Sequence, residues 1–444
     1  MTTIYSARWV LPVSAAAIEN GAVAVKGQRI AAVGPTGEIV AKFPEARVES
    51  LGEAVILPGL INTHTHLELT ALRGYLEKEE NDFFAWLRKL TIARLERMTP
   101  DDIRVSATWG ACEAVRAGIT CVGDASDSAL LSMSALQDVG LRGVVYQESF
   151  GPDARLAQEN FEKLKLKVDE LRGQESRLVR AGVSPHAPYT VCTPQLEMIV
   201  ELAHSERLPV MMHAAESEAE ELLLREGCGA FAEGLARRSI EWKAPGLSTI
   251  QYLKQVGILQ TMPLLAHCIR VDDDDIETLR NYHAKVAHCP KSNAKLGHGR
   301  APLAKFLKEE VIVGLGSDSV ASNNTCDILE EARFATLMAR AAGDHVSANE
   351  VVKAATLGGA LCFDLESEIG ELKEDAQADL IAVKLTGVHQ TPGYDPVATL
   401  IFASSGRDVF LTVIAGREVY RDGRVTTVDE DRLRARMSEI RALL

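Results

Sequence analysis

Two histidines separated by one residue, His64 and His66, follow a short apolar stretch that begins at Pro58. In a β-strand, residues two positions apart point to the same side, so both imidazoles can reach one metal ion. A lone His-x-His pair is weak evidence for a metal site. Its value depends on the other polar residues that the fold brings to the same place.

Two further residues complete a candidate ligand set. His213 ends the apolar run 208–212, and Asp318 ends the apolar segment 311–317. A buried carboxylate is costly unless it meets a cation or hydrogen-bond donors. Three neutral imidazoles, one carboxylate and an open position for water describe a catalytic zinc site. We therefore predict one divalent metal ion, with Zn²⁺ as the first choice and Fe²⁺ or Mn²⁺ as less specific alternatives, on His64, His66, His213 and Asp318.

These residues must be positioned by a larger framework. The middle of the chain alternates apolar, strand-like runs with helical patterns, which is typical of parallel βα units. The strand-like runs are 54–63, 119–124, 143–148, 179–184, 209–213, 264–267, 285–288 and 311–318. Eight such units in about 310 residues suit a (β/α)8 barrel with insertions, and a doubly wound sheet is the alternative.

Ionisable residues stand where these runs end, and barrel enzymes place their chemistry at the C-terminal ends of the strands. The residues are His64 and His66, Asp124, Glu148, His186, His213, His267, His288 and Asp318. Asp124 and Glu148 either orient other groups or pair locally, and His298 is expected to be a loop residue. Two connections, 70–99 and 228–253, are long, and the first carries an aromatic stretch at 83–87 that is a candidate lid.

The two ends of the chain share a different pattern. Residues 21–27 and 410–416 read as short alternating strands punctuated by glycine. The predicted fold class is therefore α/β: a TIM-like barrel over 57–367 and a small β-sandwich domain built from both termini, residues 1–56 and 368–430. Residues 431–444 are expected to form a C-terminal helix.

Composition excludes several classes of partner. A formal charge of −14 disfavours nucleic acid or acidic membranes, which need a broad basic face. No apolar run approaches the ~20 residues of a membrane span, and the first residues lack a secretory pattern. We expect a cytoplasmic protein that acts on a small molecule. Its eight cysteines lack CxxC pairs and are expected to be reduced thiols in the core.

Six strings at the predicted strand ends carry a family resemblance. They are PGLINTHTH at 58–66, SPHAPYT at 184–190, HAAE at 213–216, AHC at 266–268, HCPKSNAKLG at 288–297 and GSDSVASNN at 316–324. Together they resemble the amidohydrolase superfamily, in the branch of cytosine, guanine and methylthioadenosine/S-adenosylhomocysteine deaminases and triazine hydrolases. Two-metal members typically carry a lysine at the end of the fourth strand. Here that strand ends at His186, which favours one metal.

The resemblance also implies roles. Glu216 would shuttle a proton to a ring nitrogen, and Asp318 would accept a proton from the metal-activated water. His267 would hydrogen-bond that water or the tetrahedral centre. Attack at the amino-bearing ring carbon would then release ammonia. The predicted catalytic residues are thus Glu216, His267 and Asp318, and the predicted substrate-binding residues are Trp86, His186, Glu216, His288 and Asn293.

The substrate class implied by the resemblance is an aminated purine nucleoside, of the methylthioadenosine/S-adenosylhomocysteine type or the 6-aminodeoxyfutalosine type. The former enzymes carry a ribose-binding carboxylate nine residues after the tryptophan, whereas counting from Trp86 gives Leu95. On a helix, the shift to Glu96 turns the side chain by about 100°. A triazine or other N-heterocycle is the alternative, a noncatalytic metal-binding scaffold is a remote one, and a homodimer is common among relatives.

Overall fold

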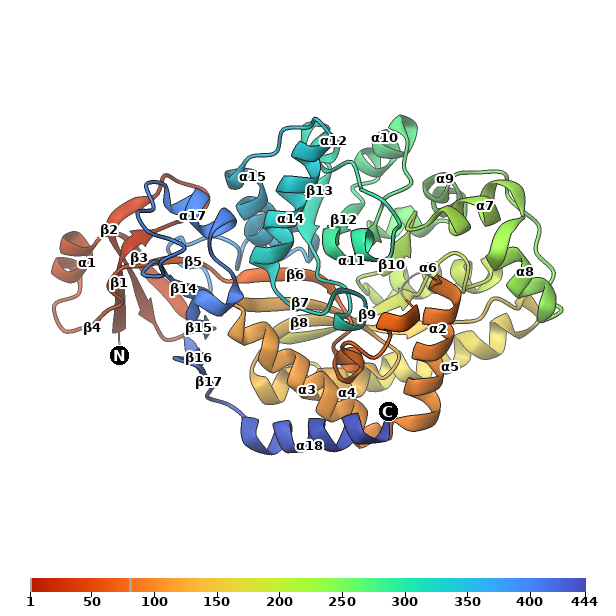
Figure 1. The fold of residues 1–444 in the computed structure, drawn as a ribbon, viewed down its shortest axis with the longest axis horizontal. Helices are drawn as coiled ribbons and strands as arrows, with labels where there is room; N and C mark the ends of the chain where they lie inside the picture. The colour runs from red at the N-terminus through yellow and green to blue at the C-terminus, as the bar shows by residue number, and fades with distance from the viewer. Residues whose placement is uncertain (1, 80–81) are drawn as a thin grey trace.

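The computed structural model describes residues 2–79 and 82–444, and its centre is a barrel of eight parallel strands (Figure 1). Two four-stranded arcs are joined by a bridge between Val183 and Val210 and closed where the Asp318 N–H donates to the His64 carbonyl. The strands are β6 (Leu60–Thr65), β7 (Ile119–Ser126), β8 (Arg142–Ser149), β9 (Val179–Pro185), β10 (Met211–Ala214), β11 (Leu264–His267), β12 (Lys285–His288) and β13 (Ile312–Leu315).

Helices cover the outside of the barrel, because the strands are buried on both faces and need an apolar layer around them. The helices that follow the barrel strands along the chain are α3 (Pro100–Arg116), α4 (Ala129–Val139), α5 (Ala157–Arg172), α6 (Thr193–Glu206), α7 (Glu218–Glu226), α8 (Gly229–Arg237), α9 (Thr249–Gln255), α10 (Asp273–Asn281), α11 (Pro290–Lys295), α12 (Leu303–Lys308), α13 (Val320–Asn323), α14 (Ile328–Ala341), α15 (Ala348–Lys353) and α16 (Gly359–Cys362). Helix α3, for example, begins at a capping box in which the side chains of Thr99 and Asp102 accept each other's backbone N–H groups.

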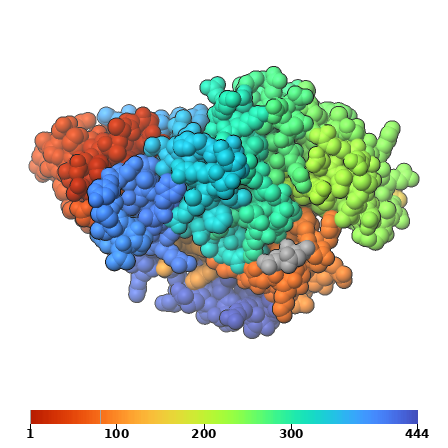
Figure 2. Space-filling view, turned by 45° about the horizontal axis from the view of Figure 1, so that its top comes forward, coloured from red at the N-terminus to blue at the C-terminus, as the bar shows by residue number. Residues whose placement is uncertain are grey.

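The two ends of the chain meet in a nine-stranded sheet, and their red and blue surfaces adjoin at one end of the molecule (Figure 2). The order is β17-β16-β15-β14-β5-β1-β2-β3, and β4 pairs with β1. The strands are β1 (Thr2–Val10), β2 (Ile18–Lys26), β3 (Arg29–Pro35), β4 (Arg47–Ser50), β5 (Ala54–Pro58), β14 (Leu380–Lys384), β15 (Val409–Ile414), β16 (Arg417–Arg421) and β17 (Arg424–Val425). Helices α1 (Thr36–Lys42) and α17 (Pro396–Phe402) flank this region, whereas α18 (Glu430–Leu443) packs against α3 of the barrel.

The run 54–63, predicted as the first barrel strand, is two strands instead. β5 pairs with β1 and β14 in the terminal sheet, whereas β6 pairs with β7 in the barrel. Gly59 lies between them, and a Cβ there would come within 2.0 Å of the Thr120 side chain. The chain can therefore cross closely from one sheet to the other only where it has no side chain.

The predicted fold class is confirmed: the protein is an α/β barrel with an additional β unit made from both termini. The domain boundaries themselves stay a prediction. All eight cysteines are free and all except Cys228 are buried. Among the described helices, none combines the length and apolar character that crossing a membrane requires.

Candidate metal centre and reaction cavity

Three imidazoles meet at the C-terminal ends of β6 and β10. The Nε2 atoms of His66 and His213 are 3.3 Å apart, and the ring centroids of His64 and His213 are 4.7 Å apart. His213 donates from Nδ1 to the His186 carbonyl oxygen at 2.9 Å, which leaves its Nε2 free to bind a metal ion. The strand register predicted from His64-Thr-His66 thus brings both side chains to one point.

Asp318 faces the same point from the loop after β13. Its Oδ1 lies 3.6 Å from Nε2 of both His64 and His66. The backbone at Asp318 is left-handed, with φ of 54°, and Ser292, Ser319 and Ser322 donate hydrogen bonds to its carboxylate. Such a conformation is uncommon for a non-glycine residue and persists where the surroundings hold it. These donors fix the direction of the carboxylate.

These residues fit a divalent cation. The side-chain ligand atoms of His64, His66 and Asp318 lie within 4.8 Å of one another, as do those of His64, His213 and His267. Burial lowers the pKa of His64 to about 4 and also lowers the pKa values of His66 and His213, so the imidazoles are neutral near pH 7, the form that binds metals. Nε2 of His64 is buried with no hydrogen-bond partner among the described residues, as expected of an atom that holds a metal ion.

The carboxylate carries the matching charge. Burial by itself would raise the pKa of Asp318, but the neighbouring imidazoles, His64 above all, lower it well below its ordinary value. Asp318 is therefore ionised at neutral pH. A carboxylate beside neutral nitrogen ligands is the donor set of a catalytic zinc site.

His267 stands beside this cluster at the end of β11. Asn293 accepts a hydrogen bond from its Nδ1 at 2.8 Å, so its Nε2 carries a lone pair. That Nε2 is buried, has no hydrogen-bond partner among the described residues, and lies 3.7 Å from Oε1 of Glu216. His267 is therefore placed to accept a hydrogen bond from a water molecule at the metal centre.

Glu216 extends from the turn after β10, three residues beyond His213. Tyr189 Oη is 3.4 Å from one carboxylate oxygen, and Nε2 of His298 is 3.7 Å from the other. His298 does lie in a loop, as predicted, but no sequence pattern marks it as a neighbour of the predicted proton shuttle. Phe83 packs edge-on against its ring, with centroids 4.8 Å apart.

A buried carboxylate fixes the turn that carries Glu216. Glu220 accepts the backbone N–H groups of both Ala215 and Glu216, at 2.8 and 2.9 Å, and a hydroxyl from Thr249. Ala215 itself has a φ of 53°. Burial raises the pKa of Glu220 to about 7. No sequence pattern predicted Glu220, because its only mark is its position seven residues after the strand-end His213.

A cavity of about 440 Å³ opens over these residues. Its floor is His66, His186, His213, Glu216, His267 and Asp318, and its roof consists of Phe83, Trp86, Leu87, Leu90 and Leu95. The roof residues come from α2 (Phe83–Ile92) and the π-helical turn Ala93–Arg97 that follows it. The predicted lid thus lies over the site, while residues 80 and 81 of that segment lie outside the described residues.

The roof shows which of the neighbouring residues Leu95 and Glu96 faces the cavity. Leu95 lines the cavity although 63% of it is exposed, whereas Glu96 is exposed and is absent from the lining. The π-helical turn alters the side-chain register there, yet it does not bring Glu96 inward. The Glu96 carboxylate therefore does not take the place of a ribose-binding carboxylate at position 95.

Charged groups form one corner of the cavity. Arg94 lies against Glu68, with Nε 3.2 Å from Oε1, and also pairs with Asp127. Burial raises the pKa of Glu148 well above its ordinary value, and Glu148 lies 3.9 Å from Nδ1 of His66. Asp124 accepts the Leu67 N–H at 2.7 Å and is outside the cavity lining, so it supports the turn after β6. Glu68, Arg94 and Asp127 were not among the residues predicted from the sequence.

The remaining predicted substrate-binding residues divide into two groups. Trp86 and His186 line the cavity, and His186 is fixed by Thr190, 2.9 Å from its Nδ1. His288 and Asn293 are buried behind the floor and are not among the described lining residues. Asn293 instead orients His267, as described above, and burial lowers the pKa of His288 to about 3. The substrate contacts themselves stay a prediction.

Comparison with known proteins places the chain in a family. Residues 55–419 match the amidohydrolase family, and residues 21–46 match the imidazolonepropionase-like composite domain of bacteria. A 5-methylthioadenosine/S-adenosylhomocysteine deaminase of Pelotomaculum thermopropionicum is 33% identical over 94% of this chain and 92% of its own. Another protein with that name, from Symbiobacterium thermophilum, is 34% identical over 98% of this chain and 97% of its own.

Solved structures agree in fold. A zinc-bound adenosine deaminase of Xanthomonas campestris matches with a TM-score of 0.88 and 28% identity, covering 99% of this chain and 98% of the other. The zinc complex of atrazine chlorohydrolase from Arthrobacter aurescens matches with a TM-score of 0.85, 22% identity and 99% coverage of both chains, which shows the fold alone.

The barrel, with its histidines and aspartate at the strand ends, defines a metal-dependent hydrolase. The chain belongs to the amidohydrolase family, as the sequence strings predicted. It is a hydrolase that acts on C–N bonds other than peptide bonds, in cyclic amidines.

Proposed function

We propose that this enzyme removes the amino group of a 6-aminopurine nucleoside and that its metal ion is Zn²⁺. The observation that carries the proposal is the position of Glu216, whose carboxylate lies 3.7 Å from Nε2 of His267 beside the imidazole and Asp318 cluster. A proton donor, a water-orienting imidazole and a metal-binding carboxylate in one cavity are what hydrolytic deamination needs.

Each residue has a defined task in this proposal. A zinc ion held by His64, His66, His213 and Asp318 would lower the pKa of a water molecule toward neutrality. Glu216 protonates the ring nitrogen next to the amino-bearing carbon, which makes that carbon electrophilic. His267 orients the water for attack, and Asp318 takes its proton and passes it to the departing amine. The remaining hydroxyl proton returns to Glu216, and ammonia leaves.

The cavity supports a nucleoside-sized substrate. Its volume of about 440 Å³ lies within the range of small-molecule sites, and its aromatic roof offers faces for stacking a base. Curated relatives that cover nearly the whole chain are named as deaminases of adenine-containing nucleosides. Asp127, which also lines the cavity with 27% of its side chain exposed, offers an acceptor for sugar hydroxyls in place of the carboxylate missing at Leu95.

Leu95 is the observation that favours the second candidate, a triazine or other N-heterocycle without a sugar. An apolar side chain at this position suits a substituent that makes no hydrogen bond there. The two candidates differ in what the roof must recognise and share the chemistry of the floor.

A substrate panel tests the proposal. We expect ammonia release from at least one of adenosine, methylthioadenosine, S-adenosylhomocysteine and aminodeoxyfutalosine, and none from guanine, cytosine or melamine. Glu216→Gln should lower kcat/KM by about 10²- to 10⁴-fold while zinc content is unchanged, because it removes the proton donor and keeps the shape. The matched control is Glu218→Gln, on α7, with 73% of its side chain exposed. Turnover of a triazine with no nucleoside turnover would overturn the proposal.

A further inference from the structure

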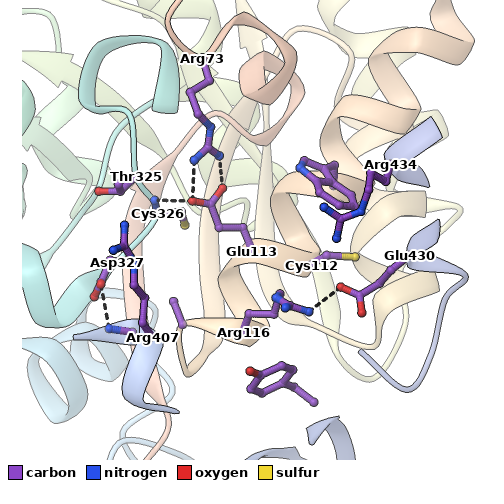
Figure 3. A pocket seen from close by; sticks show the side chains of 14 residues that line it. Arg73, Cys112, Glu113, Arg116, Thr325, Cys326, Asp327, Arg407, Glu430 and Arg434 are labelled. Carbon is purple, nitrogen blue, oxygen red and sulfur yellow. Dashed lines mark hydrogen bonds and ion pairs between the residues drawn. The ribbon is translucent and has the colours of Figure 1, made fainter. Parts of the chain in front are cut away.

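A second cavity, of about 490 Å³, lies outside the barrel between α3, α18 and β16 (Figure 3). The loop residues 325–327 and 406–407 complete its wall. Of the described residues that line it, none also lines the reaction cavity. A ligand bound here is therefore not the substrate of the metal centre.

Four arginines surround this cavity, and two of them already have carboxylate partners. Arg73 pairs with Glu113, with one hydrogen bond at 3.0 Å, and Arg116 pairs with Glu430 at 2.7 Å. Glu113 also accepts the Cys326 N–H, and Glu430 also accepts the Val425 N–H. Both carboxylates are thus engaged on several sides.

The third carboxylate of the wall is engaged as well. Asp327 caps the N-terminus of α14 by accepting the N–H groups of Leu329 and Glu330 through Oδ1. Its Oδ2 accepts the Gly406 N–H at 2.8 Å. Backbone donors therefore use both oxygens of Asp327, and an arginine that approached it would have to displace them.

The other two arginines, Arg407 and Arg434, make no ion pair with any described residue. Arg434 lies over the Trp109 ring, 5.4 Å from its centroid, and Figure 3 shows Arg407 on the opposite side of the cavity. Their positive charges are left without a carboxylate although the chain as a whole carries a formal charge of −14. Guanidinium groups bind carboxylates and phosphates through paired hydrogen bonds.

We propose that this cavity is a binding site for a small organic oxyanion, a carboxylate or phosphate monoester attached to a planar ring. Arg407 and Arg434 hold the anionic group from two sides. The ring stacks on the guanidinium plane of Arg116, which is itself packed on Tyr420, while Trp109 supports Arg434 from behind. The cavity volume is sufficient for such a molecule. The site is independent of the proposed reaction.

Calorimetric titration of the metal-loaded enzyme tests the site with benzoate and with phenyl phosphate, two ring-bearing oxyanions. Benzamide, which has the same ring without the charge, is the ligand control. We expect saturable binding of at least one oxyanion and none of benzamide. Arg407→Gln and Arg434→Gln should each weaken that binding at least tenfold, because each removes a charged, bidentate donor. The comparison of the two oxyanions identifies the preferred group.

Arg237→Gln is the matched protein control, since Arg237 lies on α8 with 71% of its side chain exposed and away from this cavity. Thermal unfolding of each variant verifies that its fold is intact. The absence of saturable binding in the wild-type enzyme would overturn the proposal. So would equal weakening by Arg237→Gln, which indicates unspecific attraction, or unchanged binding in both cavity variants, which indicates a site elsewhere.

Discussion

The floor and the roof of the reaction cavity are built on different principles. In the floor, nearly every polar side chain has a neighbour that sets its direction: Asn293 for His267, the His186 carbonyl for His213, and serine donors for Asp318. The roof is mostly apolar and lies on α2 and the π-helical turn after it. The floor is therefore suited to one type of chemistry. Substitution of a few side chains in the roof would change which substrate the enzyme binds.

Removal of the metal ion tests the floor and has the largest expected effect. A chelator that takes the metal away should abolish ammonia release, because the water then keeps its ordinary pKa. Added zinc should restore activity in proportion to the zinc bound, as measured by elemental analysis. Full activity in protein shown to be free of metal would contradict the assignment of the floor.

Substitution in the roof should affect binding more than chemistry. In Trp86→Leu the loss of base stacking, worth about 1–3 kcal/mol, raises KM roughly 5- to 150-fold and changes kcat much less. Steady-state kinetics measure both constants, and Trp9→Leu, in the terminal sheet, is the control. A fall in kcat with unchanged KM would show that the roof acts in the chemical step.

His298 links the two regions, since Phe83 of the roof packs against its ring and its Nε2 faces Glu216. We expect His298→Gln to lower kcat by about five- to tenfold, because it removes the imidazole that lies 3.7 Å from the Glu216 carboxylate. It should also shift the pH profile of kcat/KM, which a purely structural role would leave unmoved. The control is His345→Gln, at an exposed position. An unchanged pH profile would show that His298 does not position Glu216.

The smallest effect concerns the histidine behind the floor. Burial lowers the pKa of His288 to about 3. Between about pH 6.5 and pH 3, His288 is therefore protonated in the unfolded chain and neutral in the folded chain. The free energy of unfolding should therefore fall as the pH is lowered from about 6.5, by up to about 1.4 kcal/mol per pH unit for this group. Urea titrations should give a shallower dependence for His288→Gln, and equal slopes would contradict the prediction.

The sequence predicted most of the barrel because its evidence is local. Apolar runs of strand length, each followed by an ionisable residue, are visible without any contact information. The run 54–63 was the exception, because β5 and β6 follow each other directly in the sequence and are both continuously apolar, although they belong to different sheets. Only the pairing of β5 with β14, more than three hundred residues away, separates them.

Two of the site residues that no sequence pattern marked have a common cause. Glu220 and His298 lie outside the strand ends, and nothing in their neighbours along the chain marks them. Their importance comes from contacts that a turn or a loop creates with Glu216. The converse holds for His288, which stands at a strand end yet lies behind the floor, because its strand position alone does not set whether its side chain reaches the cavity.

The sequence by itself determined the family, the parallel barrel and the candidate ligands His64, His66, His213 and Asp318, because strand periodicity and short strings encode them directly. Only the tertiary structure decided which groups surround Glu216, that Leu95 rather than Glu96 lines the roof, and that Arg407 and Arg434 share a cavity. These facts depend on distances between residues far apart in the chain. Such distances are set by packing, which no local pattern records.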